Sequence, residues 1–195
     1  MKKKISIILC TYNEVNYIED TIRLIISTLE NPEIIIVDDN SNDGTLEKLE
    51  KLKSILNFKL VVRKNERGLA SAQKRGFDES TGEYVGTIDV NSKDQILYFT
   101  KLVEKLNNGY DFGVLSRYIP GGGDERIFTR SCASWLINFV SRTFLRIPFN
   151  DFTSGIFLMK RKLLDYSGII KKGYAEWFIE FVYIAYKNKY KIIEI

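Results

Sequence analysis

Apolar runs and amphipathic stretches alternate along residues 1–115 of the chain. The apolar runs are short and rich in β-branched residues, as expected of strands buried on both faces. They predict strands over Lys4–Cys10, Glu33–Val37, Lys59–Arg63, Tyr84–Ile88 and Phe112–Leu115. Helical periodicity predicts helices over Val15–Leu29, Thr45–Leu56, Leu69–Ser80 and Gln95–Leu106. This alternation predicts an α/β fold, with a Rossmann-like, mainly parallel sheet and helices on both faces.

The pattern is less regular after residue 115. Beyond the glycine-rich stretch PGGGDE, it predicts a helix over Ile127–Phe144, a strand in GIFLMK and a helix around Trp177–Asn188. No linker or repeat divides the chain, so we expect one domain over residues 1–195, with halves 1–115 and 116–195. The last residues, KIIEI, have the composition of a further strand, and we expect the domain to be truncated there.

The composition is that of a soluble globular protein, with 45% hydrophobic and 28% charged residues. A net charge of +4 is too small to indicate a nucleic-acid partner, but it suits an anionic small ligand or an anionic membrane surface. No apolar run is long enough to span a bilayer. The two cysteines, Cys10 and Cys132, are far apart in the sequence, which favours reduced thiols in a cytosolic protein.

The chain contains no histidine. Ser-His-Asp triads, histidine zinc sites and imidazole general bases are therefore excluded. Any catalysis must use carboxylates, arginine, lysine, hydroxyl groups or a metal ion that is held by oxygen ligands.

Four of the predicted strands end in clusters of polar residues. These clusters are Cys10–Glu14, Asp38–Asn40, Asp89–Asn91 and Ser116–Tyr118. Ligands of doubly wound sheets bind beyond the carboxyl ends of the strands, so we expect the clusters to form one site. The first strand is not followed by the G-x-G-x-x-G turn of dinucleotide-binding folds, and there is no P-loop. The sequence therefore predicts a nucleotide-type pocket that is built from side chains.

Several of these segments together resemble glycosyltransferase family 2. They are TYNE, VDDNSNDGT, NERGLASAQKRGF, the acidic end of the fourth strand and SRYIPGG. The segments SRYIPGGG and DFTSG, with Arg130 and Ser134 between them, are similar to the polyprenol-phosphate (dolichol-phosphate) mannose synthases of that family. The resemblance covers nearly the whole chain and implies a GT-A-type fold. It also implies that residues 1–115 bind the nucleotide and that residues 116–195 form the acceptor side.

The resemblance implies a donor pocket at the ends of the first, second and fourth strands. The donor-binding residues it implies are Cys10, Tyr12, Glu14, Val37, Asp39, Asp89, Val90 and Asn91. Tyr12 can stack on a base, while Glu14 and Asp39 can accept hydrogen bonds from ring N–H groups and ribose hydroxyls. For Asp38 we favour a different role, as the cap of the turn that follows it.

The fourth strand end departs from the family pattern. Family members have Asp-x-Asp there, which holds Mg²⁺ or Mn²⁺ under the sugar diphosphate. This chain has Asp89 followed by Asn91, with Lys93 two positions further on. The resemblance implies Asp89 and Asn91 as metal ligands, although a neutral amide binds a hard cation less strongly than a carboxylate. Lys93 either replaces part of the metal's charge or lies in solvent.

The resemblance implies that Arg117 and Arg130 bind the acceptor phosphate or the donor diphosphate, and that Ser134 donates a hydroxyl to the acceptor phosphate. It implies Asp89, Arg117 and Arg130 as the catalytic residues. Arginine suits this role because its guanidinium can pair with phosphate through two hydrogen bonds. For Arg130, a surface salt bridge is the alternative. Tyr118 and Gly121–Gly123 indicate either a loop that closes over the site or a plain turn.

A polyprenyl phosphate acceptor also fits the absence of a strong base. Its phosphate oxygen is anionic at neutral pH and can attack the anomeric carbon of the sugar directly. The protein then has to align the two substrates and neutralise the departing diphosphate. A single in-line displacement predicts inversion of the sugar's configuration.

The segment Cys132–Ile147 is amphipathic and rich in Trp, Phe and Leu. It predicts either a helix at a membrane interface or a helix that packs in the core, and the exposure of Trp135, Phe139 and Val140 distinguishes the two.

From the resemblance we expect an inverting transferase on the cytoplasmic side of a membrane, peripheral in the residues given. It would move mannose from GDP-mannose, the sugar nucleotide, to a polyprenyl phosphate lipid. Two alternatives stay open at this point. One is a related transferase with another donor or a glycan acceptor, and the other is a catalytically impaired nucleotide-sugar-binding domain. The oligomeric state is not determined by the sequence.

Overall fold

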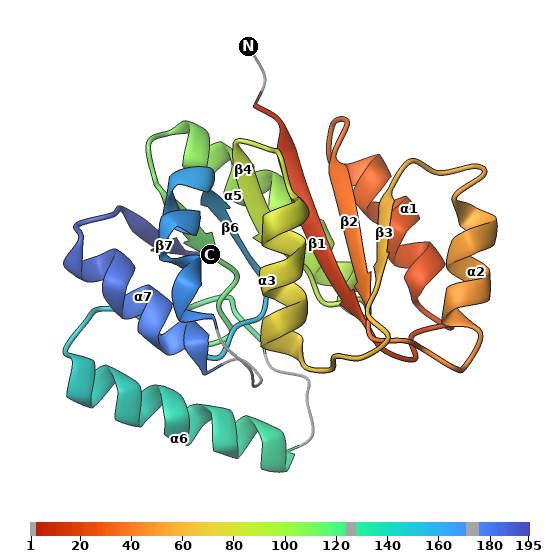
Figure 1. The fold of residues 1–195 in the computed structure, drawn as a ribbon. Coiled ribbons are helices and arrows are strands. Elements are labelled where there is room, and N and C mark those ends of the chain that lie inside the picture. The colour runs from red at the N-terminus through yellow and green to blue at the C-terminus, as the bar shows by residue number, and fades with distance from the viewer. Residues whose placement is uncertain (1–2, 124–127, 171–175) are drawn as a thin grey trace.

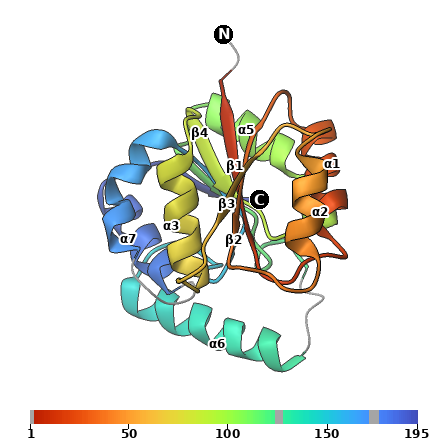
Figure 2. The same ribbon diagram turned by 45° about the vertical axis from the view of Figure 1, so that its right-hand side comes forward.

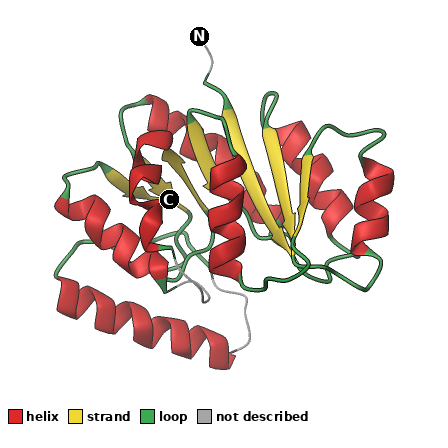
Figure 3. Ribbon diagram, viewed as in Figure 1, coloured by secondary structure: helices red, strands yellow, loops and turns green. Residues whose placement is uncertain are grey.

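A seven-stranded sheet with the order β3-β2-β1-β4-β6-β5-β7 runs through the protein (Figures 1 and 3). The computed structural model describes residues 3–123, 128–170 and 176–195. The strands are β1 (Ile5–Thr11), β2 (Glu33–Asp38), β3 (Lys59–Val62), β4 (Tyr84–Thr87), β5 (Phe112–Val114), β6 (Phe157–Lys160) and β7 (Ile192–Glu194). Each of the strands that the sequence predicts is present, with ends shifted by one or two residues.

The sheet is mainly parallel, as predicted. Strands β1 to β4 pair with one another in parallel, and β5 is parallel to β7. Strand β6 is inserted antiparallel between β4 and β5. Because β6 opposes both neighbours, β5 runs in the same direction as β1 and β4. The carboxyl ends of β1, β2, β4 and β5 therefore lie at one edge of the sheet.

The helices also follow the predicted order. They are α1 (Ile18–Thr28), α2 (Thr45–Leu52), α3 (Leu69–Glu79), α4 (Lys93–Ile96), α5 (Phe99–Asn107), α6 (Phe128–Leu145) and α7 (Trp177–Lys187). The prediction of one helix over Gln95–Leu106 was wrong. The chain tightens there, because the N–H of Tyr98 donates to the Gln95 carbonyl three residues back, and two helices result. A 3₁₀ helix over Arg161–Ile169, labelled η1, was not predicted.

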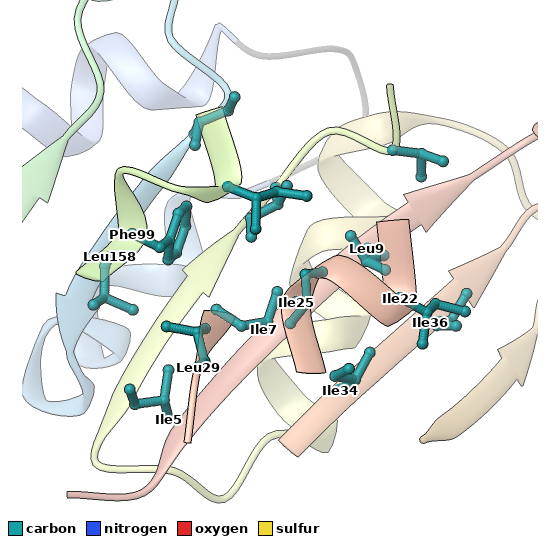
Figure 4. Close-up of a cluster of buried hydrophobic side chains, with 14 of the residues drawn as sticks. Ile5, Ile7, Leu9, Ile22, Ile25, Leu29, Ile34, Ile36, Phe99 and Leu158 are labelled. Carbon is teal, nitrogen blue, oxygen red and sulfur yellow. The ribbon is translucent and has the colours of Figure 1, made fainter. Parts of the chain in front are cut away.

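Alternating side chains of β1 enter two different layers of core. Ile7 and Leu9 pack with residues of α1 and α5, and Figure 4 shows this cluster. Ile8 points to the other face and packs with residues of α3 and α7. Figure 2 shows the two helical layers on opposite sides of the sheet, with α3 and α7 on one side and α1 and α2 on the other. This double coverage explains the nearly continuous apolar sequence of β1.

Helix α6 lies apart from these two layers. Figure 1 shows it along the lower end of the molecule, the end toward which β1 and β2 point. It therefore lies on the side of the protein where the polar strand ends meet.

Gly76 allows α3 to pack directly against β1. A methyl group on Gly76 would lie 2.4 Å from Cγ2 of Ile8, which is fully buried. Alanine is the better helix former, but overpacking of a core costs about 1–3 kcal/mol. We therefore expect Gly76→Ala to lower the free energy of unfolding, as measured by denaturant titration. Gly168→Ala is the control, because nothing lies within 4 Å of the added methyl there. Equal stability of the two variants would contradict the close packing.

Candidate functional site

Asp38 organises the turn after β2. Its side chain is fully buried, and it accepts hydrogen bonds from the Ser41 N–H at 2.8 Å and from the Ser41 hydroxyl at 2.7 Å. The hydroxyl of Thr11, at the end of β1, also donates to Asp38 at 2.8 Å. The predicted role of Asp38 as a turn cap is confirmed. This carboxylate joins the ends of β1 and β2.

Asp39 is held between two neighbours. Its Oδ1 accepts a hydrogen bond from Nε of Arg63 at 2.7 Å, and its Oδ2 accepts one from the Gly68 N–H at 2.9 Å. Arg63 also donates to the Gly68 carbonyl at 3.0 Å and to the Ser71 hydroxyl at 2.8 Å. Asp39 thus fixes the segment that leads from β3 into α3. Whether it also contacts a nucleotide stays a prediction.

Arg67 lies over the ring of Tyr12, with its guanidinium carbon 4.3 Å from the ring centroid. Its Nη2 also donates to the Tyr12 hydroxyl at 2.8 Å. Tyr12 is 42% exposed, so a ring surface remains open to a ligand. The sequence reasoning assigned no role to Arg63 or Arg67. The signal available for Arg67 was its place in NERGLASAQKRGF, a segment that carries the family resemblance, whereas Arg63 lies two residues before that segment.

The other predicted donor-pocket residues differ in exposure. Val37 and Val90 are buried, while Cys10 and Glu14 are partly exposed. Burial, followed by the negative charge of Asp89, raises the pKa of the Cys10 thiol. Partial burial and the charges of Asp43 and Asp89 raise the pKa of Glu14. The ends of β1 and β4 are neighbours in the sheet, where the Ile88 N–H donates to the Ile8 carbonyl, so the two ends share an electrostatic environment.

Asp89 and Asn91 are both exposed at the end of β4. A Cβ atom on Gly155 would lie 3.2 Å from each oxygen of the Asp89 carboxylate, so the glycine leaves room beside it. Among the described residues, no three Cys, Asp or Glu side chains form a cluster that could hold a metal ion. Mg²⁺ is commonly held by one or two protein ligands together with substrate phosphates. Asp89 and Asn91 fit a site of that kind.

Lys93 forms an ion pair with a residue of a neighbouring helix. Its ammonium pairs with Asp20 of α1 at 2.6 Å on the exposed surface. Hydrogen bonding to Lys93, followed by the Lys93 charge, lowers the pKa of Asp20. Of the two alternatives for Lys93, this pairing favours the solvated surface residue over a replacement for the metal's charge.

Arg117 forms a bidentate ion pair with Asp151. Its Nε donates to Oδ2 at 2.8 Å and its Nη2 to Oδ1 at 2.7 Å, and the Arg117 backbone N–H donates to Oδ2 at 3.0 Å. Asp151 is fully buried. None of these bonds uses Nη1 of Arg117. The guanidinium is therefore fixed in orientation by a carboxylate on one of its sides.

The loop after β5 folds back over Arg117. A Cβ atom on Gly122 would lie 2.6 Å from the Ser116 carbonyl and 2.7 Å from the Arg117 carbonyl, so a side chain there would displace the loop. Tyr118 lies beside Arg117, and its hydroxyl is buried with no hydrogen-bond partner among the described residues. Buried hydroxyl groups are normally paired. The Tyr118 hydroxyl is thus an available donor within the site.

Helix α6 has inverted polarity. Among its side chains from residue 131 onward, the buried ones are polar: Ser134, Asn138 and Ser141. Its apolar residues face outward instead, and Trp135, Phe139 and Val140 are 57%, 57% and 42% exposed. The rings of Trp135 and Phe139 stack on this outer face. The exposure contradicts the core-packing alternative for this helix.

Two of the predicted acceptor residues lie on α6. Ser134 is buried on the inward side of the helix. The side chain of Arg130 lies outside the part of the chain that the structure describes. No helix in the described residues combines the length and the hydrophobicity that are needed to cross a membrane.

Residues 6–168 match the sequence profile of Glycosyl transferase family 2. The chain belongs to this family. A dolichol-phosphate mannosyltransferase of Pyrococcus furiosus is 34% identical over 169 residues, covering 83% of this chain and 47% of that protein. A dolichol-phosphate mannosyltransferase of Saccharomyces cerevisiae is 35% identical over 136 residues, covering 68% of this chain and 50% of that protein. This family 2 chain thus spans about half the length of these relatives.

Solved structures confirm the GT-A-type fold. Glucosyl-3-phosphoglycerate synthase from Mycobacterium tuberculosis, in complex with UDP, superimposes with a TM-score of 0.71 at 18% identity, covering 98% of this chain and 70% of that one. The same enzyme in complex with Mn²⁺, UDP and glucosyl-3-phosphoglycerate gives a TM-score of 0.67. At this identity the likeness concerns the fold.

The raised pKa of Glu14 predicts a pH-dependent cost in stability. A folded-state pKa above the ordinary value of about 4.3 means that ionisation of this carboxyl disfavours folding, and the cost is absent at lower pH. Glu14→Gln should therefore raise the melting temperature at pH 7 and leave it unchanged near pH 3. Because Glu14 is partly exposed, we expect a gain below about 1 kcal/mol.

Thermal unfolding at the two pH values measures this effect. Glu104→Gln, at an exposed position of α5, is the control for removal of one negative charge. If Glu14→Gln and Glu104→Gln shift the melting temperature equally at pH 7, the coupling of Glu14 to Asp43 and Asp89 is wrong.

Proposed function

We propose that this protein is an inverting glycosyltransferase that moves mannose from GDP-mannose to a polyprenyl (dolichyl) phosphate. The similarity to two dolichol-phosphate mannosyltransferases supports this choice of donor and acceptor. The observation that carries it in the structure is the position of α6, whose apolar face is exposed at the end of the sheet where the polar strand ends meet. A site beside an outward apolar helix suits a lipid whose phosphate is the reacting group.

The donor would bind across the ends of β1, β2 and β4. Tyr12 offers a ring for base stacking, while Glu14 and Asp39 are acceptors for base and ribose groups. Asp89 and Asn91 would hold Mg²⁺ or Mn²⁺, which supplies positive charge to the diphosphate leaving group when it is bound. Cys10, Val37 and Val90 would line the walls of this pocket.

The acceptor phosphate would meet Arg117, together with Arg130 and Ser134. Asp151 already neutralises part of the Arg117 charge and fixes its guanidinium plane. Arg117 would therefore act mainly by alignment, through the part of the guanidinium that faces away from Asp151. The phosphate oxygen needs no general base, since it is anionic at neutral pH, and its alignment with the anomeric carbon provides the rate enhancement.

Helix α6 would lie in the interface of an anionic membrane. Aromatic and aliphatic side chains on an outward face partition into the boundary between headgroups and acyl chains. Arg142 of this helix already donates to the Asn150 side chain, so Arg146, which is exposed just after the helix, would meet lipid phosphates. We propose the cytoplasmic face, where sugar nucleotides are available, with the described residues attached peripherally.

Transfer assays test the proposal. The purified protein is incubated with vesicles that contain polyprenyl phosphate, with Mg²⁺ or Mn²⁺, and with GDP-mannose or other labelled sugar nucleotides. Formation of mannosyl lipid of inverted anomeric configuration is expected with GDP-mannose. If sugar is transferred only from another sugar nucleotide, the proposed donor is wrong. Nucleotide binding without transfer from any donor would overturn the proposal and indicate an impaired nucleotide-sugar-binding domain.

Asn91→Asp should strengthen metal binding. The substitution adds a second carboxylate beside Asp89, and ligand charge tunes the affinity of such sites. We expect activity to saturate at a metal concentration about tenfold lower, a difference of about 1.4 kcal/mol in binding free energy. Titration of Mg²⁺ and Mn²⁺ against activity measures this change. Superimposable titrations for the two forms would remove Asn91 from the set of metal ligands.

Arg117→Lys should lower turnover more than donor affinity. Lysine keeps a positive charge but cannot make both hydrogen bonds to Asp151, so alignment is lost while attraction remains. A misplacement of this kind lowers kcat by about 100-fold, and kcat and donor affinity are measured at saturating acceptor. Arg117→Ala is less informative, because removal of one partner leaves Asp151 as a buried unpaired charge. Full turnover by Arg117→Lys would refute the geometric role.

A further inference from the structure

An asparagine on the inward face of helix α6 forms hydrogen bonds to the rest of the protein. Asn138 is 5% exposed and lies between Ser134 and Ser141 on that face. Its Oδ1 accepts a hydrogen bond from the Phe152 N–H at 2.7 Å, and its Nδ2 donates to the Thr153 hydroxyl at 3.2 Å. Both ends of the amide are therefore bound to the segment that follows Asn150.

The same segment holds Arg117. The Thr153 hydroxyl that Asn138 contacts also accepts a hydrogen bond from Nη2 of Arg117 at 2.8 Å. Asp151, two residues earlier, forms the bidentate ion pair with Arg117. Nδ2 of Asn138 lies 3.5 Å from Oδ1 of Asp151. Only one side chain, that of Thr153 or Asp151, separates the α6 amide from the guanidinium.

The opposite side of this segment is fixed by the sheet. Glu194 of β7 accepts hydrogen bonds from the backbone N–H groups of Asn150 at 2.8 Å and Asp151 at 2.9 Å. Arg142 of α6 adds a second contact, at 2.8 Å, to the Asn150 side chain. The segment is therefore held by β7 on one side and by α6 on the other.

Hydrogen bonds hold the middle of α6 to this segment, while Leu145 at the end of the helix packs against the core. The buried residues at the middle of the helix are polar, while its large apolar side chains face outward. A rotation of the helix would leave the Phe152 N–H and the Thr153 hydroxyl without the Asn138 amide, and unpaired buried polar groups are costly. The amide thus fixes the orientation in which α6 presents its apolar face.

We propose that Asn138 is a positioning residue for Arg117 and that it couples the seating of α6 to the alignment of the acceptor-binding guanidinium. The inference rests on the proposed function, because it takes a polyprenyl phosphate as the group that Arg117 meets. Membrane contact of α6 and orientation of Arg117 then depend on one another through Thr153 and Asp151. A lipid acceptor would be engaged only when both are in place.

Replacement of Asn138 tests the coupling. Asn138→Leu removes both hydrogen bonds, and Asn138→Ser is a second variant that matches the other small polar residues of the inward face. Thr143→Val is the control on α6, since the Thr143 hydroxyl donates to the Phe139 carbonyl within the helix and not to the segment that follows Asn150. For both Asn138 variants we expect kcat with vesicle-borne polyprenyl phosphate to fall by about tenfold or more. Donor affinity should change by less than about twofold, since the donor pocket is not altered.

A double-mutant cycle shows whether Asn138 acts through Thr153. If it does, Thr153→Val combined with Asn138→Leu should lower kcat no further than the more damaging single substitution. If the factors by which the two substitutions lower kcat multiply in the double mutant, Asn138 does not act through Thr153. The proposal as a whole would be overturned if kcat were unchanged in both Asn138 variants. It would also be overturned if donor affinity fell by the same factor as kcat.

A spectroscopic measurement separates this inference from the proposed function. The Nε–H of Arg117, which donates to Asp151, gives a resonance that NMR can follow for chemical shift and hydrogen exchange. In Asn138→Ser we expect the shift to move and exchange to accelerate, with no change in Thr143→Val. If the wild-type protein transfers no sugar, the proposed function fails while this readout still decides the coupling. An unchanged Arg117 resonance in Asn138→Ser would refute the coupling even where transfer is observed.

Discussion

Because helices cover β1 on both faces, the polar side chains of this strand are confined to its ends. Ser6 near its start is buried and donates to Glu33, while Thr11 at its finish donates to Asp38. The neighbouring strands run parallel, so their polar ends collect at the same edge. Because the middle of the sheet is buried, its polar groups are concentrated at one edge. The candidate site forms at that edge for this reason.

Buried carboxylates then arrange the edge. Asp38 joins two strand ends, Asp39 holds the segment before α3, and Asp151 holds Arg117. Each accepts hydrogen bonds from backbone N–H groups or from an arginine, which compensates the loss of water around the charge. The side chains of Tyr12 and Asp89 are exposed above this scaffold. Rigid support beneath exposed groups is what alignment of two substrates requires.

Much of this arrangement could be predicted from the sequence. The apolar periodicity located the strands and most helices, and the placing of polar residues after four strands located the edge where they meet. The turn-capping role of Asp38 followed from local chemistry, because its partner Ser41 is three residues away. The family resemblance, carried by several separate motifs, agrees with the profile match and with the fold.

What the sequence left out depends on contacts between distant residues. Hydrophobic periodicity indicates which residues of a strand are buried but not the direction in which the strand pairs with its neighbours. The antiparallel insertion of β6 was therefore not predicted. The partners of Asp39 and Arg117 are 24 and 34 residues away, and nothing in the local pattern selects them. The amphipathic pattern of α6 identified two faces but not which one points inward. Hydrogen bonds from Asn138 to residues 14 and 15 positions later settle that orientation.

The place of β6 in the sheet has a consequence for the order of folding. Strand β5, which leads to Arg117, pairs only with β6 and β7 in the described sheet, and both of these follow it along the chain. Strands β1 to β4 pair among themselves without β6, so the donor-side strands can assemble while β5 has no partner. Closing the long connection between β5 and β6 is a slow, entropically unfavourable step. During synthesis on the ribosome, the ends of β1, β2 and β4 would therefore come together before the segment around Arg117, which becomes native only when Phe157–Lys160 docks against β4.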